Sequence, residues 1–453
     1  MSQSFFSRFT SGKWPAAALS ALFLMGAALY NGYPLLYADT GTYLASGFEL
    51  ETPYDRPITY GLFIRIFSLN GFSTWPVIFA QSFLLALVIY ECFRQFAPQA
   101  SASRATILGT LTLCCFTGVS WVSSWLIADV FTPVTILCTL LLLYGKHTRG
   151  AAAGWLFLLL LGLCTHLSHV LMSAPLFLLA LLWALRARKK KIGTPFKISH
   201  ALAGLLLCML AFFSMGSAAS KSRHVYLMGR LVETGVIDTY LADNCAKKPL
   251  ALCRWRDSLP PDAGTFMFDS TGAFAQMGGR TGTKQEFDAI IADVFTSPKY
   301  LARYLGAGIS GTLKQLVTIN AGEGLCHYPP GSRPYERMKH YFPAELNEYR
   351  FSKQAFNLFT QLPLANFLYY LSAGISLLLL LSWRFGGNAS VELRRLFDFL
   401  VLAYVVQCAV CVNFSTLANR FGCRVVWLFP LFLLMLWFNG EYRPKLREDK
   451  KSA

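Results

Sequence analysis

The sequence has few charged residues for its length. Only 14% of its 453 residues are Asp, Glu, Lys or Arg, whereas soluble globular domains usually carry about 25%. This shortage excludes an ordinary soluble enzyme, and it also excludes a disordered chain, which would be polar and rich in charge. Apolar residues make up 54% of the sequence and aromatic residues 15%. Such a composition is typical of a protein whose solvent is partly lipid.

Other common patterns are missing as well. The sequence holds no internal repeat of fixed period, no low-complexity tract and no set of Cys and His residues with the spacing of a zinc site. Acidic residues are scarce beside basic ones, at 24 against 41, so the formal net charge is +17. In a soluble protein this excess would suggest nucleic-acid binding, so its meaning depends on where the charges lie.

Ten stretches are candidate membrane spans, because a helix needs about 20 mostly apolar residues to cross a hydrocarbon core about 30 Å thick. Residues 152–185 form one apolar block that is too long for one span, so we divide it at the polar sequence Thr165-His166-Leu167-Ser168-His169. The first stretch has no small-residue cleavage site after it and is interpreted as an uncleaved anchor. The ten predicted spans are 14–34, 74–93, 105–122, 125–145, 152–166, 168–185, 198–216, 362–383, 395–413 and 422–439.

The basic residues indicate how these spans are oriented. With the N-terminus inside, the inner loops and tails hold 20 Lys and Arg residues, whereas the short outer segments hold only four. Short cytoplasmic loops carry an excess of Lys and Arg, so we expect a multi-pass protein of a bacterial inner membrane with both termini in the cytoplasm. Most of the +17 is then a topology signal that also attracts anionic lipid headgroups. A nucleic-acid partner is not needed to explain it.

The fold class that follows is an all-α polytopic membrane protein with an extracytoplasmic, mainly helical domain. We predict a seven-span module over 1–216 with a long outer loop at 35–73, an outer domain over 217–361, a three-span module over 362–440 and a basic tail over 441–453. In the outer domain, apolar residues at helical spacing between 297 and 317 predict amphipathic helices that lie on the membrane or on other spans. Cys245 and Cys253 lie close in sequence there. An outer location permits a disulfide, although spacing leaves reduced thiols open as well.

Ionisable side chains at the membrane edge are functional candidates, because they are costly in that place. Asp39 follows the first span, and Asp129 lies at the outer end of the fourth. A carboxylate such as Asp39 can take the proton of an attacking hydroxyl, and Asp129 can hold a divalent cation such as Mg²⁺ or Mn²⁺ or orient an acceptor. Arg and His can bind a leaving phosphate. The other candidates on the outer side are Asp55, Arg56, His166, His169, Arg420 and Arg424.

Each candidate also has a purely structural alternative. Asp39 could cap the helix that follows it, and Asp55 with Arg56 could be a surface ion pair of little consequence. Asp129 could simply end a helix. The two histidines could satisfy backbone groups at a broken helix, and the two C-terminal arginines could be interfacial anchors.

The order of these pieces resembles the GT-C superfamily of membrane glycosyltransferases. Members have a first span followed by a long outer loop that begins with an acidic residue and a nearby Tyr, here Asp39 and Tyr43. An Arg-Pro-x-x-Tyr-like stretch then leads into the second span, here from Arg56 to Tyr60. A second acidic residue occupies a short outer loop, here Asp129.

The resemblance continues toward the C-terminus. Many members place a Lys against the donor phosphate at a later break between spans, where this sequence has His166 and His169. Members often show an Arg before an apolar run with Pro near the end of the chain, here Arg420 or Arg424. Many members carry their soluble domain at the C-terminus, whereas here it lies between the seventh and eighth spans.

The resemblance implies an inverting transfer of a hexosyl or pentosyl group on the outer face of the membrane. The donor would be a polyprenyl-phosphate sugar, the acceptor a hydroxyl of a glycan, lipid or protein, and Asp39 the general base. The donor phosphate would be held by His166, His169, Arg420 and Arg424, and the acceptor, sugar or loop would be supported by Tyr43, Asp55, Arg56 and Tyr60. The alternatives are a transporter or flippase of a lipid-linked or anionic solute and a non-enzymatic membrane subunit. Transporters often have inverted repeats and mid-membrane charges, whereas this sequence has neither feature.

Overall fold

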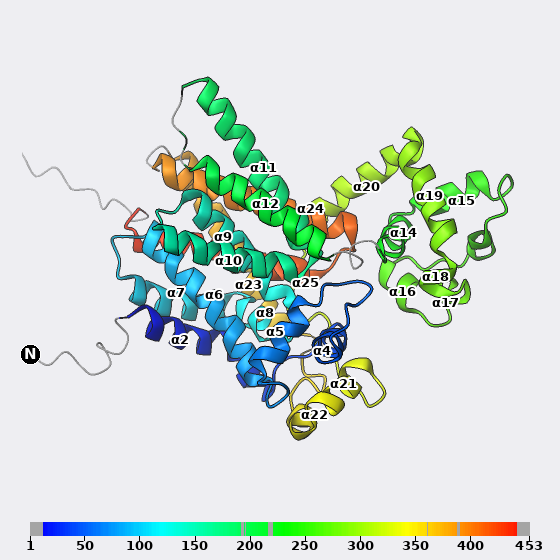
Figure 1. The fold of residues 1–453 in the computed structure, drawn as a ribbon, viewed down its shortest axis with the longest axis horizontal. Coiled ribbons are helices and arrows are strands. Elements are labelled where there is room, and N and C mark those ends of the chain that lie inside the picture. Colours follow the sequence, from blue (N-terminus) through cyan, green and yellow to red (C-terminus); the bar gives the residue numbers. More distant parts are fainter. Residues whose placement is uncertain are drawn as a thin grey trace, which may run out of the picture.

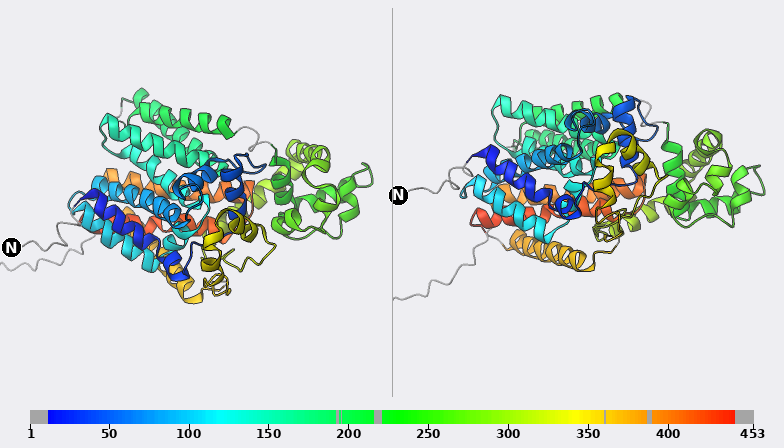
Figure 2. Two further views of the ribbon diagram at one scale, coloured as in Figure 1. Left: turned by 60° about the horizontal axis from the view of Figure 1, so that its bottom comes forward. Right: turned by 90° about the horizontal axis from the view of Figure 1, so that it is seen from below.

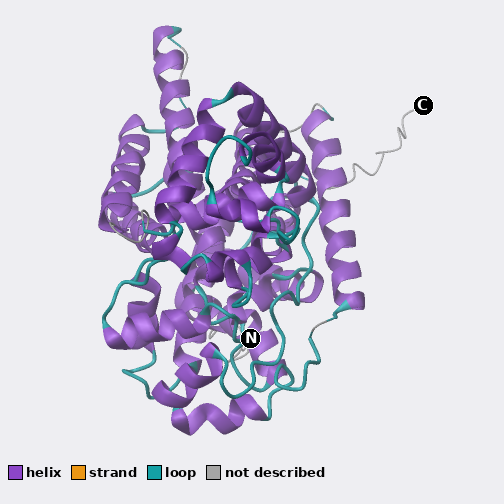
Figure 3. Ribbon diagram, turned by 90° about the vertical axis from the view of Figure 1, so that its right-hand side faces the viewer, coloured by secondary structure: helices purple, strands orange, loops and turns teal. Residues whose placement is uncertain are grey.

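The computed structural model describes residues 12–191, 194, 196–215, 221–359, 361–386 and 390–441, and over these residues the regular structure is helical, without a β-strand (Figure 3). The predicted all-α fold class is therefore confirmed. The basic tail after Glu441 and the predicted domain boundary between 216 and 217 lie outside the described residues.

Within these described ranges, six helical segments are long and apolar enough to cross a membrane, which indicates a membrane protein. The last of them contains two consecutive helices that meet at Trp427. The segments are α6 (Trp75–Phe96), α11 (Leu167–Lys189), α12 (Ile198–Met215), α23 (Pro363–Phe385), α24 (Val391–Phe414) and α25 (Asn419–Val426) with α26 (Leu428–Phe438). Shorter apolar helices are α7 (Ala102–Phe116), α9 (Phe131–Tyr144) with the preceding 3-10 turn η1 (Ala128–Val130), and α10 (Arg149–Thr165).

The structure thus supports six spans where the sequence predicts ten. The stretch predicted as the first span is broken at Met25 into α2 (Lys13–Leu24) and α3 (Gly26–Asn31). The third is broken near Gly118 into α7 and α8 (Val119–Ser124). The fourth and fifth are helices shorter than a full crossing.

Serine hydroxyls of α8 explain the first of these breaks. Ser120 Oγ accepts from the backbone N–H of Ala27 at 2.8 Å, and Ser124 Oγ accepts from that of Ala28 at 3.0 Å. Ser123 Oγ donates to the carbonyl of Leu24 at 2.7 Å. Backbone groups away from water must be satisfied within the protein, so these hydroxyls allow the helix to be interrupted. Hydropathy, which averages over such a stretch, does not reveal the interruption.

A separate lobe lies beyond one end of the helical bundle (Figures 1 and 2). It contains α14 (Arg223–Glu233), α15 (Val236–Asn244), η2 (Ala251–Trp255), α16 (Ala263–Phe268), α17 (Ala273–Gln276), α18 (Gly279–Gly282) and α19 (Lys284–Thr296). The lobe has its own hydrophobic core, which includes Met228, Phe266 and Phe287. A disulfide joins Cys245 to Cys253 within it.

Helix α20 (Pro298–Leu316) connects the lobe to the bundle and packs along α24. Its buried residues include Tyr304, Gly308 and Gln315, whereas Leu305 and Ile309 are exposed. This single helix corresponds to the predicted amphipathic stretch.

The rest of the predicted outer domain belongs to the bundle. Residues 319–359 contain α21 (Arg333–Tyr341), η3 (Pro343–Glu345) and α22 (Leu346–Arg350), and α21 packs on α4 (Thr40–Glu49). Buried residues of this segment, such as Tyr335 and Tyr349, join the hydrophobic core of the bundle. The described residues of the stretch 217–361 are therefore divided between two cores.

The bundle has two ends with different residues. The end that carries α4, α25 and the lobe is named the Asp39 end. The end where α6, α9 and α26 finish and where α12 and α24 begin is named the basic end, because Lys146, Lys197 and Arg395 lie there.

Candidate functional site

Two short helices at the Asp39 end place the first group of predicted residues. Asp39 immediately precedes α4, and Arg56 lies three residues before the start of α5 (Thr59–Phe67). The two helices cross so closely that a Cβ on Gly47 would lie 2.1 Å from the carbonyl oxygen of Gly61. Only glycine permits this approach, which folds the intervening loop back over the start of α4.

The Asp39 carboxylate lies between two arginines that are far apart in sequence. Its Oδ1 is 3.0 Å from Arg56 Nη1, and its Oδ2 is 3.3 Å from Arg420 Nη1. Asp39 occupies the N-cap position of α4, but its side chain makes no capping hydrogen bond. The side chain remains 26% exposed. The ion pairs, rather than helix capping, therefore occupy this carboxylate.

The two arginines also set the proton affinity of Asp39. Burial alone would raise the pKa of the carboxyl, but Arg56 and Arg420 outweigh it and hold the pKa well below its usual range. The carboxylate is thus ionised at neutral pH. It is a weak proton acceptor while both guanidinium groups contact it, and it becomes a stronger one when either of them turns toward another anion.

Arg56 is held by three neighbours. Besides Asp39, its Nη2 contacts Asp55 Oδ2 at 2.8 Å, and its guanidinium lies over the ring of Tyr43 at 5.1 Å. The side chains of Arg56 and Asp55 are only 11% and 12% exposed. They therefore form a largely buried pair rather than the surface pair that was the structural alternative.

Arg420 is positioned from three directions in the first turn of α25. Its guanidinium lies 4.6 Å from the ring of Tyr37, and its side chain is 17% exposed. Its backbone N–H donates to Glu323 Oε2 at 2.9 Å. Glu323 is a residue of this site that the sequence reasoning missed. The sequence feature that could have indicated it is a carboxylate between two glycines, Gly322 and Gly324. In the structure both glycines adopt positive φ.

Asp129 and Arg424 form a second ion pair that is sealed from solvent. Arg424 Nη1 is 3.0 Å from Asp129 Oδ1, and the two side chains are 1% and 6% exposed. Arg424 Nη2 donates to Gln407 Oε1 at 3.2 Å. The predicted contact of Arg424 with a donor phosphate therefore does not fit its surroundings. This arginine joins α24, α25 and the turn before α9.

The two histidines have different surroundings. His169 is 1% exposed, and its ring nitrogens contact the carbonyl of Gly162 at 2.8 Å and Thr132 Oγ1 at 2.8 Å. The break after α10 frees that carbonyl, so His169 takes the structural alternative and the predicted phosphate contact does not fit it. His166 accepts the N–H of Ser168 at the start of α11. Its ring is less buried and interacts electrostatically with Arg56, Arg420 and Arg424.

Tyr60 supports the site from within the core. It is fully buried, its ring packs edge-on against Tyr43 with centroids 4.9 Å apart, and its hydroxyl donates to Gln81 Oε1 at 2.8 Å. Gln81 Nε2 in turn donates to the carbonyls of Ser123 and Trp125 at 2.8 Å. Tyr60 therefore fixes α5 against the bundle and does not reach the surface of the site.

A metal site at Asp129 lacks suitable companions. Across the described part of the chain, no three His, Cys, Asp or Glu side chains gather closely enough to hold a metal ion. Oδ1 of Asp129 contacts Arg424, and Oδ2 is buried without a hydrogen-bond partner. A guanidinium in direct contact with the only carboxylate disfavours a second cation, so the donor set does not fit Mg²⁺ or Mn²⁺.

An apolar groove begins at Thr59, three residues after Arg56 in the sequence, and runs along the bundle. It has a volume of about 950 Å³ and lies between α5, α6 and α10. Thr59 lies at one limit, and Lys13 and Arg94 lie among the lining residues near the basic end. The wall between these limits includes Leu62, Phe63, Leu84, Leu87, Trp155 and Leu158.

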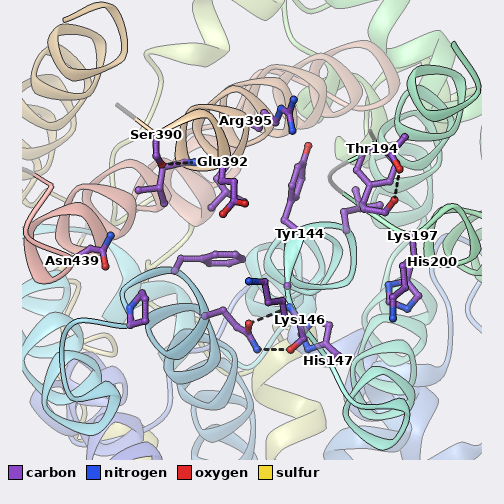
Figure 4. Close-up of a pocket in the computed structure, with 18 of the residues that line it drawn as sticks. Tyr144, Lys146, His147, Thr194, Lys197, His200, Ser390, Glu392, Arg395 and Asn439 are labelled. Atoms are coloured by element: carbon purple, nitrogen blue, oxygen red, sulfur yellow. Dashed lines mark hydrogen bonds between the residues drawn. The ribbon is translucent and has the colours of Figure 1, made fainter. Parts of the chain in front are cut away.

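The basic end contains a larger and more polar cavity of about 1260 Å³ (Figure 4). Lys146, Lys197 and Arg395 line it together with Glu392. The imidazoles of His147 and His200 contact the carbonyls of Leu141 and Leu142 at the end of α9, each at 2.7 Å. Sequence reasoning assigned these cations to topology, and the cavity shares no residue with the Asp39 site.

The structure thus brings Asp39, Arg56 and Arg420 into direct contact, with Asp55 and Tyr43 against Arg56. It places Asp129 with Arg424 one helical turn further along α25. Comparison of the chain with protein-family models, with curated proteins and with solved structures finds no match in any of the three.

Proposed function

We propose that this protein is a membrane-embedded glycosyltransferase of the GT-C type. It transfers a sugar from a polyprenyl-phosphate donor to an acceptor hydroxyl at the Asp39 end of the bundle. The observation that carries the proposal is the partly exposed Asp39 carboxylate between Arg56 and Arg420. A general base and two phosphate-binding groups are what this reaction requires.

In the proposed reaction, the acceptor oxygen bonds to the anomeric carbon while the bond from that carbon to the phosphate oxygen breaks. The electron pair of the broken bond stays on the polyprenyl phosphate, and the acceptor proton passes to the Asp39 carboxylate. The displacement inverts the anomeric configuration. Arg420 and Arg56 stabilise the charge that develops on the phosphate.

Phosphate binding would also activate the base. When the donor phosphate takes a guanidinium away from Asp39, the pKa of the carboxyl rises, because the two arginines keep it low in the free protein. The charges of both arginines act on the His166 ring, and in this proposal His166 contributes to binding the same phosphate. Asp129 contributes indirectly, since it holds α25 in place through Arg424.

The apolar groove suits the lipid tail of the donor. It begins at Thr59, only three residues after Arg56, and its wall is almost entirely aliphatic and aromatic. A phosphate at the arginines would leave the isoprenoid chain to lie along α5, α6 and α10. Burial of such a chain contributes about 0.8 kcal/mol per CH₂ group.

The proposed topology places the Asp39 end and the lobe outside a bacterial inner membrane and the basic end in the cytoplasm. Support comes from the uneven distribution of Lys and Arg residues along the sequence. In this proposal the broken and shorter helices complete crossings together with their neighbours, which gives ten passes. The polyprenyl-phosphate sugar and a glycan, lipid or protein acceptor are then the partners.

The test is Asp39→Asn in proteoliposomes supplied with candidate polyprenyl-phosphate sugars and acceptors. The amide cannot take a proton, so we expect transfer to fall by about 10² to 10⁴-fold. Asp398→Asn is the matched control, because Asp398 also pairs with an arginine, Arg384, but near the start of α24. Unchanged transfer by the Asp39 variant would remove Asp39 as the base. Movement of an intact donor across the bilayer without transfer would favour a flippase instead.

A further inference from the structure

We propose that the lobe is a working part of the Asp39 site, with Tyr226 as a positioning residue for the Asp55–Arg56 pair. The catalytic consequence of this inference rests on the proposed function. The structural coupling itself does not, and it can be measured separately.

The first contact between lobe and site runs through a shared carboxylate. Tyr226, on α14, donates from its hydroxyl to Asp55 Oδ2 at 3.1 Å. The same oxygen contacts Arg56 Nη2 at 2.8 Å, and Arg56 Nη1 contacts Asp39. Two hydrogen-bonded steps therefore separate the lobe from the guanidinium that pairs with the proposed base.

A second contact fixes the backbone of the same loop. Ser222 Oγ, immediately before α14, donates to the carbonyl of Tyr54 at 3.0 Å. Arg280 Nη1 donates to Ser222 Oγ at 2.6 Å, and the carbonyl of Arg280 contacts His224 Nε2 at 2.9 Å. The segment that carries Asp55 and Arg56 is thus held by Tyr226 of α14 and by Ser222, and Arg280 of α18 fixes Ser222 in turn.

The lobe also reaches the segment that leads to Arg420. Glu233, at the end of α14, accepts from Thr416 Oγ1 at 2.8 Å. On the connecting helix α20, Tyr304 donates to the carbonyl of Asn413 at 2.6 Å, and Gln315 contacts both backbone groups of Ala418. Ala418 lies two residues before Arg420.

Both arginines that contact Asp39 therefore lie on segments that the lobe and its connecting helix hold. In this proposal the lobe, which has its own hydrophobic core and its own disulfide, moves as a unit relative to these segments. A displacement of the lobe changes how tightly Arg56 and Arg420 surround Asp39. An acceptor that contacts the lobe thereby acts on the strength of the base.

The decisive variant is Tyr226→Phe, which removes one hydroxyl and keeps the ring. We expect the rate of amide hydrogen exchange over residues 50–58 to rise by about fivefold. This is the factor by which the loss of one native hydrogen bond raises the equilibrium constant for local opening. We also expect the acid limb of the pH–rate profile to move upward by roughly half a unit, because a loosened Arg56 lowers the pKa of Asp39 less.

Tyr240→Phe is the matched control. Tyr240 is buried in the same lobe, and its hydroxyl donates to Asp293 Oδ2 at 2.6 Å, away from the bundle. This control variant shows whether the loss of any tyrosine hydroxyl in the lobe produces the same changes. We expect neither the hydrogen exchange over residues 50–58 nor the acid limb of the pH–rate profile to change. Asp55→Asn combined with Tyr226→Phe provides a second control, since the two changes act on one contact and their effects should not add.

Unchanged exchange over 50–58 in Tyr226→Phe would overturn the coupling. A rise in exchange with an unmoved acid limb would show that Tyr226 is only a structural brace, and it would overturn the positioning role. If the unaltered protein transfers no sugar from any donor, the proposed function fails, while the exchange experiment still decides whether the lobe holds the loop.

Discussion

Helix α25 presents two arginines one turn apart, and each forms an ion pair with an aspartate from the first third of the chain. Arg420 meets Asp39 in a partly exposed pair that also includes Arg56 and the ring of Tyr37. Arg424 meets Asp129 in a pair that is almost fully buried. The same residue types at i and i+4 thus serve two purposes. A ligand can reach the partly exposed pair and replace one partner in it. No ligand reaches the buried pair, so that pair has a structural role only.

The largest effect that would test this difference is on stability. Arg424→Ala leaves the Asp129 carboxylate buried without a partner, and we expect the free energy of unfolding to fall by about 3–5 kcal/mol. Arg420→Ala should cost about 1 kcal/mol or less, because Asp39 keeps Arg56 and contacts solvent. Thermal unfolding in detergent measures both. Equal losses in the two variants would show that the pairs do not differ as described.

The next effect is on transfer activity. Here Arg420 should be more important than Arg424, which is the reverse of their order in stability. Arg420→Gln removes a phosphate contact and should lower transfer by about 10²-fold while the protein stays folded. Arg420→Lys should restore only part of the rate, because an ammonium cannot bind two phosphate oxygens in a fork. The comparison is of kcat/KM at matched protein quality. Full activity of Arg420→Gln would contradict a phosphate role for Arg420.

A smaller effect concerns pH. The pKa of Asp39 is lowered in the folded protein, so its ion pairs contribute stability above its unfolded pKa of about 3.9, and that contribution is lost as the pH falls toward the folded value. Between pH 5 and 8 we therefore expect no slope from this residue. In Arg56→Gln the loss should be smaller and should be complete at a higher pH, because with one arginine less the folded pKa of Asp39 lies closer to its unfolded value. Unfolding measured from pH 3 to 8 checks this, and identical profiles for both proteins would exclude the assigned cause.

The smallest effect is expected at the basic end. Lys146→Gln and Lys197→Gln should each change the free energy of unfolding by less than about 0.5 kcal/mol, because both residues are exposed or lie at the rim of the cavity. Transfer should stay at the wild-type rate. A large loss of transfer in either variant would move functional importance to the opposite end of the bundle.

Much of the architecture follows from local composition. Apolar stretches of sufficient length predict helices wherever they occur, and six of the ten predicted spans are helices of crossing length. The other four are two interrupted stretches and two helices shorter than a full crossing. Hydropathy does not reveal the interruption of the first, because it depends on hydroxyl groups in a distant helix. These are the hydroxyl groups of the α8 serines.

The candidate site was predictable from the sequence only where a charged residue lies beside an apolar stretch, because charge is unusual in that place. Asp39 and Arg420 are charged residues beside apolar stretches, and the structure brings them together although 381 positions separate them in sequence. Glu323 was not identified from the sequence, because it lies in a polar segment where a carboxylate is common. His169 and Arg424 were assigned to phosphate binding because burial cannot be read from sequence spacing, and both are satisfied by neighbours in the core.

The interruption between α2 and α3 has a consequence for the order in which the chain assembles. The N–H groups of Ala27 and Ala28 find their partners 93 and 96 residues later in the sequence. At synthesis rates of about 5–20 residues per second, these partners emerge roughly 5–20 s after the groups they satisfy. During that interval the segment at Met25 lacks its final hydrogen bonds, so it must wait as a continuous helix or outside the lipid. The break between α2 and α3 therefore cannot reach its final hydrogen bonding until α8 has been made.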